Sequence, residues 1–75
     1  MTTDGRPKKH SLTLHGHRTS VSLEDEFWQA FRDIAREKNK GINELTAEID
    51  AARGVSSGLA SAIRLYVLNH YRRPG

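Results

Sequence analysis

Residues 18–23 read Arg-Thr-Ser-Val-Ser-Leu, and the fold depends on the structure that this stretch adopts. Polar and apolar side chains alternate along it, which is typical of a short strand with one buried side and one solvent-facing side. The buried side would hold Thr19, Val21 and Leu23, and the solvent-facing side Arg18, Ser20 and Ser22.

A strand of this length needs a pairing partner, because its backbone N–H and C=O groups cannot satisfy one another. The pattern after Leu23 is helical, so the simplest partner is the same strand from a second copy of the chain. Two such strands would form an antiparallel ribbon whose outer side carries Arg18, Ser20 and Ser22 twice.

Residues 10–17 allow more than one way to continue this sheet. Leu12 and Leu14 alternate with polar residues, and Gly16 then interrupts the pattern. Either a bulge makes these residues part of one long strand, or a tight turn folds residues 12–14 back onto residues 19–21. The alternation fits both arrangements.

Size and composition restrict the class of protein. The chain has 75 residues, of which 36% are hydrophobic, and no cysteine. It is therefore one small domain with a thin core, without disulfides or a thiolate metal site, and dimerisation is a common way to enlarge such a core. No apolar run is long enough to cross a membrane, and no apolar signal segment opens the chain, so we expect a cytoplasmic protein.

The positive charge is concentrated at the N-terminal end. Residues 1–18 carry four basic side chains and one acidic side chain, whereas residues 19–75 carry eight of each, so the formal net charge of +3 lies beside the strand. Such a distribution suits a polyanionic partner. We interpret residues 1–9 as a flexible basic arm and residues 10–73 as a single domain.

Three helical segments are expected after the strand. The first, about residues 24–39, has acidic residues at its start and apolar residues at helical spacing, and Ser22 and Asp25 have the spacing of a capping box. The second covers about residues 43–53. The third covers about residues 58–71, and its run 63–68 is apolar nearly all round, which favours burial on more than one side and hence a dimer.

The order of these pieces resembles the ribbon-helix-helix family of DNA-binding proteins, more narrowly a bacterial branch of it. Residues 16–24 (Gly-His-Arg-Thr-Ser-Val-Ser-Leu-Glu), 27–28 (Phe-Trp), 47–53 (Ala-Glu-Ile-Asp-Ala-Ala-Arg) and 61–64 (Ser-Ala-Ile-Arg) carry the resemblance, which extends over about residues 10–72. It implies a mainly α fold, in which a short N-terminal strand pairs across a homodimer and two to three helices follow. The family pattern has two helices, so residues 42–53 look like an additional one.

The resemblance also implies which residues contact DNA. By position, Arg18, Ser20 and Ser22 would face the bases in the major groove, with modest selectivity because serine discriminates little between bases. Contacts to the DNA backbone are expected from Lys8 and Lys9, and from Ser56 and Ser57 because the family anchors phosphates at the N-terminus of its last helix. The expected dimer core comprises Val21, Leu23, Phe27, Trp28, Phe31, Ile63, Tyr66 and Val67.

The expected function is a homodimeric transcription regulator that binds double-stranded DNA. One alternative is a protein-interaction module that docks a partner, as an antitoxin docks its toxin, through the acidic side of the second helix (Glu44, Glu48 and Asp50). Another is a metal- or pH-responsive sensor. Catalysis is not expected, because neither a nucleophile with its base nor a phosphate-cradling glycine loop is evident. No cofactor or metal is expected, since His15 and His17 have no cysteine or carboxylate nearby in sequence to complete a ligand set.

Overall fold

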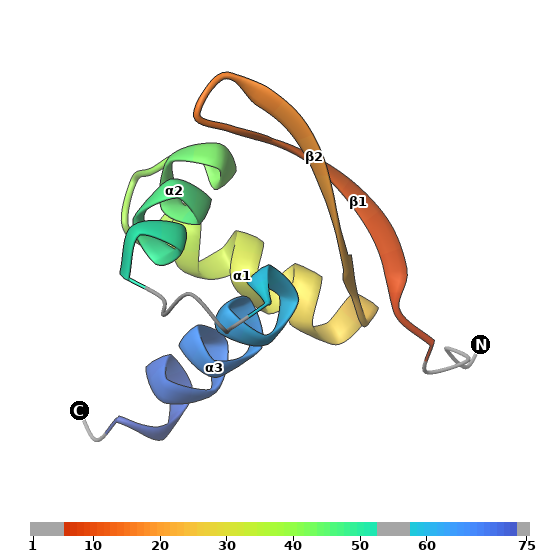
Figure 1. Cartoon of the computed structure of the whole chain (residues 1–75). Helices are drawn as coiled ribbons and strands as arrows, with labels where there is room; N and C mark the ends of the chain where they lie inside the picture. The colour runs from red at the N-terminus through yellow and green to blue at the C-terminus, as the bar shows by residue number, and fades with distance from the viewer. Residues whose placement is uncertain (1–5, 53–57, 74–75) are drawn as a thin grey trace.

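The computed structural model describes residues 6–52 and 58–73. Within them the chain forms an antiparallel hairpin, β1 (Lys8–Leu14) and β2 (His17–Leu23), followed by three helices, α1 (Asp25–Glu37), α2 (Ile42–Ala52) and α3 (Leu59–Arg72). Figure 1 shows the hairpin arching over one side of the helices, with its tip beside α2 and its open end beside the start of α1. This arrangement confirms the expected mainly α ribbon-helix-helix architecture, with three helices.

A two-residue turn joins the strands. Its residues, His15 and Gly16, both have positive φ, 53° and 78°, as a type I′ turn requires at both central positions. The turn sets a register that pairs Leu14 with His17 and runs without interruption to Lys8 and Leu23. Of the two arrangements that the sequence allowed, the protein therefore has the tight turn.

The observed pairing partner of β2 differs from the expected one. We expected β2 to pair first with an identical strand of a second copy, but β1 of the same chain pairs along its whole length. The reason is local, because a type I′ turn matches the twist of the strands that it joins. Strands of two copies could meet only along an outer edge of this hairpin. Lys8 and Lys9, placed by the sequence in the arm, lie within β1.

The first helix starts differently from the expected capping box. Its N-cap residue is Glu24, in extended conformation and without a side-chain capping hydrogen bond. Ser22 cannot serve as the cap because it belongs to β2. The acidic residues Asp25 and Glu26 still lie in the first turn, where the positive end of the helix dipole favours them.

One core joins the inner side of the hairpin to all three helices. It consists of Leu12, Val21, Leu23, Phe31, Ile34, Ala35, Leu45, Ile49, Ile63 and Val67. Thr46 is also fully buried, and its Oγ1 donates a hydrogen bond to the carbonyl oxygen of Ile42 (2.7 Å), so its hydroxyl is satisfied within α2. The core thus forms within one chain.

The outward side of α3 is apolar and exposed in the single chain. Leu65, Leu68 and Tyr71 are 58%, 45% and 57% exposed, although the sequence indicated burial for the run 63–68. Only Ile63 and Val67 of that run are buried. Among the helices of the described residues, none has the length and apolar character that a membrane span requires.

Candidate nucleic-acid interface

The outer face of the hairpin presents six side chains from both strands. Three cross-strand pairs make up this face: Lys9 with Ser22, Ser11 with Ser20, and Thr13 with Arg18. All six residues are exposed. The sequence identified the residues of β2 but missed Ser11 and Thr13. These two residues alternate with Leu12 and Leu14, but only the tight turn places them opposite Ser20 and Arg18 on the outer face. The structure thus places Arg18, Ser20 and Ser22 on one exposed surface with three residues of β1.

The backbone N–H and C=O groups of these six residues point away from the opposite strand of the hairpin. The N–H of Thr13 donates a hydrogen bond to Oδ1 of Asn43 on α2 (3.0 Å) and so cannot bond to β2. Thr13 and Arg18 therefore form a non-hydrogen-bonded pair, and by the alternation of antiparallel ladders so do the other two pairs of this face. In such pairs the opposing side chains lie closest together, which makes the outer face a continuous strip.

The outer face contains two cations, four hydroxyl groups and no carboxylate. Arg18 and Lys9 have no ion-pair partner among the described residues. Lys8 has the opposite orientation in the strand, and its Nζ lies 3.2 Å from Oδ2 of Asp25. The two lysines that the sequence assigned to the DNA backbone thus differ, because only Lys9 belongs to the outer face.

An arginine of α3 holds the open end of the hairpin. Nε and Nη2 of Arg64 donate to the two carboxylate oxygens of Glu24 (2.9 and 3.2 Å), and Nη2 also lies 3.3 Å from the carbonyl oxygen of Ser22. The guanidinium carbon lies 6.0 Å from the centre of the Phe27 ring. The hydrogen bond from Arg64 holds the pKa of Glu24 below its usual value. Arg64 therefore positions the end of β2, a role that the sequence did not reveal.

The middle of β1 rests on an aromatic side chain of α1. The ring of His10 stacks on Trp28, with ring centres 4.0 Å apart and planes at 7°. Trp28 in turn packs against Phe31, with ring centres 6.2 Å apart. Nε2 of His10 is buried and has no hydrogen-bond partner in the part of the chain that the structure describes. Trp28 therefore supports the hairpin from within and is not positioned to stack on a base.

The tip of the hairpin is held by α2. Nε2 of His15 lies 3.3 Å from Oδ2 of Asp50, and Asn43 bonds to Thr13 as described above. The sequence showed no carboxylate near the two histidines, but the fold brings Asp50 to one of them. In the described ranges, 6–52 and 58–73, no group of three or more histidine, cysteine, aspartate or glutamate residues could hold a metal ion.

The residues expected in the dimer core occupy the core of the single chain. Five are buried, namely Val21, Leu23, Phe31, Ile63 and Val67, and three are half-buried, namely Phe27, Trp28 and Tyr66. Their burial therefore does not require a second copy. Ser56 and Ser57, expected to contact the DNA backbone, lie outside the described residues.

A two-stranded ribbon with an exposed polar and cationic face, supported by helices, defines a class of nucleic-acid-binding protein. A family model described as a ribbon-helix-helix domain matches residues 7–71. The chain belongs to the ribbon-helix-helix family, whose fold is a non-enzymatic DNA-binding one. Searches of curated proteins and of solved structures give no match.

Proposed function

We propose that this protein is a homodimeric transcription regulator and that the outer face of its hairpin enters the major groove of DNA. The exposed strip of two cations and four hydroxyls, free of carboxylates, is the observation that carries the proposal. A two-stranded β-ribbon fits the major groove of B-DNA, which is about 12 Å wide. Carboxylates on this strip would repel the phosphates that line the groove, so their absence supports the same conclusion.

The side chains of the outer face have different tasks. Arg18 is long enough to bond to guanine with two parallel hydrogen bonds, a contact that contributes ~1–3 kcal/mol of discrimination. The serine and threonine hydroxyls both donate and accept, so they tolerate several bases. Lys9 stands at the end of the strip opposite to Arg18 and suits a phosphate. Selectivity would therefore depend mainly on Arg18.

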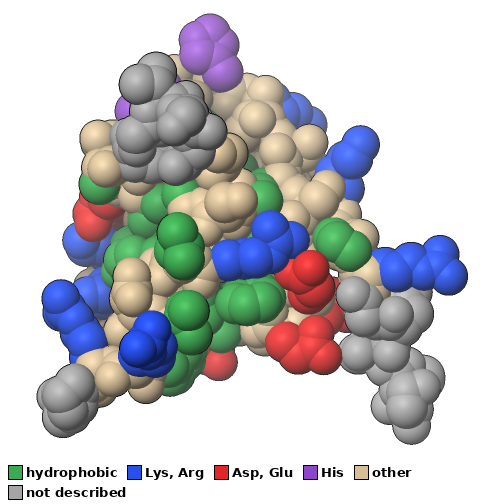
Figure 2. Space-filling model, turned by 60° about the horizontal axis from the view of Figure 1, so that its bottom comes forward, with side chains coloured by type: hydrophobic (Ala, Val, Ile, Leu, Met, Phe, Trp, Pro, Cys, Tyr) green, Lys and Arg blue, Asp and Glu red, His purple; other side chains and the backbone are tan. Residues whose placement is uncertain are grey.

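The outward side of α3 supports a dimer. Ser61, Leu65, Leu68 and Arg72 follow one another at alternating spacings of four, three and four residues, the spacing of a seam between two packed helices. Figure 2 shows apolar side chains gathered across the underside of the molecule, with charged side chains around them. Because the hairpin completes its sheet within one chain, we assign the contact between copies to this side of α3.

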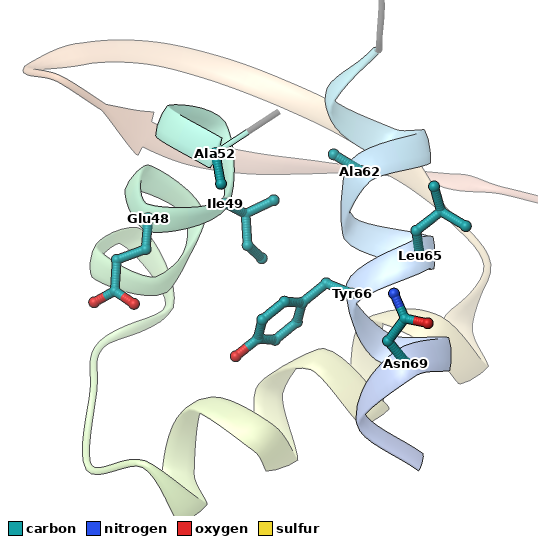
Figure 3. Close-up of a pocket in the computed structure, with 7 residues that line it drawn as sticks. All are labelled: Glu48, Ile49, Ala52, Ala62, Leu65, Tyr66 and Asn69. Carbon is teal, nitrogen blue, oxygen red and sulfur yellow. The ribbon is translucent and has the colours of Figure 1, made fainter. Parts of the chain in front are cut away.

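A groove beside the seam has room for side chains of a second copy. It has a volume of about 390 Å³ and lies between α2 and α3. Figure 3 shows Tyr66 of α3 reaching toward Ile49 of α2 across it, with Glu48 on the α2 side and Leu65 and Asn69 on the α3 side. Leucine side chains from the partner's α3 would enter this groove and cover surface that is exposed in the single chain.

DNA binding is tested with the triple variant Arg18→Ala/Ser20→Ala/Ser22→Ala in a gel shift with random duplexes at two salt concentrations. We expect affinity to fall by about fivefold or more, because the loss of the Arg18 contact alone corresponds to ~1–3 kcal/mol. Arg73→Ala, which removes one exposed arginine outside the ribbon, is the matched control and should bind normally. Unchanged binding by the triple variant would refute the proposed role of the outer face.

Dimerisation is tested by sedimentation of the wild-type protein and of Leu65→Lys/Leu68→Lys. Both leucines are exposed in the single chain, so we expect the variant to keep its helical content and to sediment as a monomer. A wild-type protein that remains monomeric at tens of micromolar, free and on DNA, would rule out the homodimer.

The alternative, docking of a partner protein through the acidic side of α2, has weaker support. Glu48 forms an ion pair with Lys40, and Oδ2 of Asp50 lies 3.3 Å from Nε2 of His15, so two of the three carboxylates already have side-chain partners in the chain. A pull-down that recovers one stoichiometric protein partner, together with no affinity for duplex DNA, would favour this alternative.

A further inference from the structure

A second group of cations lies beside the hairpin, on α1 and the turn that follows it. Arg32, Arg36 and Lys40 line a shallow hollow of about 350 Å³ together with Ala35 and Ile42. We call these three cations the basic flank. The sequence alone does not assign them to DNA, since their spacing is that of an ordinary solvated side of a helix.

The basic flank continues the surface of the hairpin. A neighbouring hollow of about 260 Å³ is lined by residues of both strands and of α2, namely Ser11, Leu12, Thr13, Arg18, Ile42 and Asn43. Ile42 lines both hollows, so they adjoin. One of them is bordered by Arg18 of the outer face and the other by the basic flank.

The packing of β1 on α1 explains this arrangement. His10 of β1 stacks on Trp28 of α1, and Arg32 and Arg36 follow Trp28 at intervals of four residues. Residues at this spacing lie on one side of a helix, about 6 Å apart along its axis. The basic flank therefore runs along the side of α1 that β1 covers at Trp28.

The charges of the basic flank are only partly neutralised. Nη1 of Arg36 lies 3.3 Å from Oδ1 of Asp33, and Lys40 is paired with Glu48. Both are exposed pairs, which contribute little to stability and exchange readily. Arg32 is exposed and has no ion-pair partner within residues 6–52 and 58–73. The basic flank can thus bind an anion without breaking a buried contact.

We propose that the basic flank binds phosphates of one DNA strand at the side of the groove that the hairpin occupies. This inference rests on the proposed function, because the hairpin must enter the groove for β1 to bring the flank to the groove wall. The phosphates of B-DNA line both walls of the major groove, so the element beside β1 meets one of them. Contacts to the DNA backbone then come from α1 and the following turn, in addition to Lys9.

The test is the salt dependence of duplex binding by Arg32→Ala/Arg36→Ala, measured by fluorescence anisotropy. Each phosphate contact contributes about 0.9 to the slope of log K against log salt concentration. Loss of two contacts in each protomer should reduce the slope by about 1.8 per protomer bound, or about 3.6 for the proposed homodimer. The affinity deficit of the variant should then shrink by roughly tenfold per protomer between 50 and 200 mM salt. Alanine is a strong helix former, so thermal melting should show an intact fold.

Three further variants test whether a change in the salt slope comes from the lost charges of the basic flank. Arg32→Lys/Arg36→Lys keeps both charges and should retain the wild-type slope. Arg73→Ala removes one cation at the C-terminal end of α3, on the side away from the hairpin in Figure 1, and should also retain it. Asp33→Asn removes the carboxylate beside Arg36 and should tighten binding.

The outcomes distinguish this inference from the proposed function. An unchanged slope in Arg32→Ala/Arg36→Ala, with normal binding by the wild type, would overturn the inference alone. A loss of slope in the Arg73→Ala control half as large as that expected for Arg32→Ala/Arg36→Ala would also overturn it, because the effect would then come from total charge. A wild-type protein that binds no duplex would overturn the proposed function and the inference together.

Discussion

Replacement of Gly16 by alanine tests the hairpin most directly. Gly16 has φ of 78°, the left-handed region, which L-residues enter at a cost of about 1–2 kcal/mol. A Cβ atom built on Gly16 meets nothing within 4 Å, so steric contact adds no cost. We therefore expect Gly16→Ala to lower the free energy of unfolding by about 1–2 kcal/mol, purely through the backbone.

The measurement is urea and thermal unfolding at one fixed protein concentration, because a dimer would make the midpoint depend on concentration. In a domain of this size each kcal/mol lowers the melting temperature by roughly 4–8 °C. Gly16→Asn is the matched control, since asparagine enters the left-handed region more readily than alanine, and it should be less destabilising. If Gly16→Ala unfolds like the wild type, residue 16 does not have positive φ, and the two-residue turn is refuted.

Three other predictions follow from single contacts. Leu23→Ala, at a fully buried site, should cost ~2–5 kcal/mol in urea unfolding, and a loss below ~1 kcal/mol would contradict the described core. Arg64 lowers the pKa of Glu24, so the stabilisation exists above the unfolded pKa near 4.5 and is lost as pH falls through the lower folded pKa. Arg64→Met should therefore flatten the acid limb of stability against pH, and an unaltered limb would argue against the pair. Glu48 raises the pKa of Lys40, so that stabilisation exists below the unfolded pKa near 10.5 and disappears as pH rises through the folded pKa. Glu48→Gln should remove this alkaline loss, which circular dichroism melting between pH 9 and 12 would detect.

Local pattern alone determined most of the secondary structure. The alternation in residues 18–23 placed Arg18, Ser20 and Ser22 on one exposed side of a strand, and the structure has them there. The periodicity of the helical segments located all three helices to within about two residues of their observed ends. The strand face and the helices could be predicted because burial of one side gives the sequence a periodicity of apolar residues. That periodicity depends only on the geometry of the strand or helix itself.

Only the tertiary structure decided which elements meet. The alternation in residues 10–14 indicates that β1 has one buried side, but it does not indicate which strand pairs with β1. The bonds from Arg64 to Glu24 and from Thr13 to Asn43 join residues 40 and 30 positions apart, and no repeat in the sequence marks them. The basic flank lies beside the hairpin because His10 of β1 stacks on Trp28 of α1. The sequence pattern of each element predicts its own secondary structure but does not predict this contact between them.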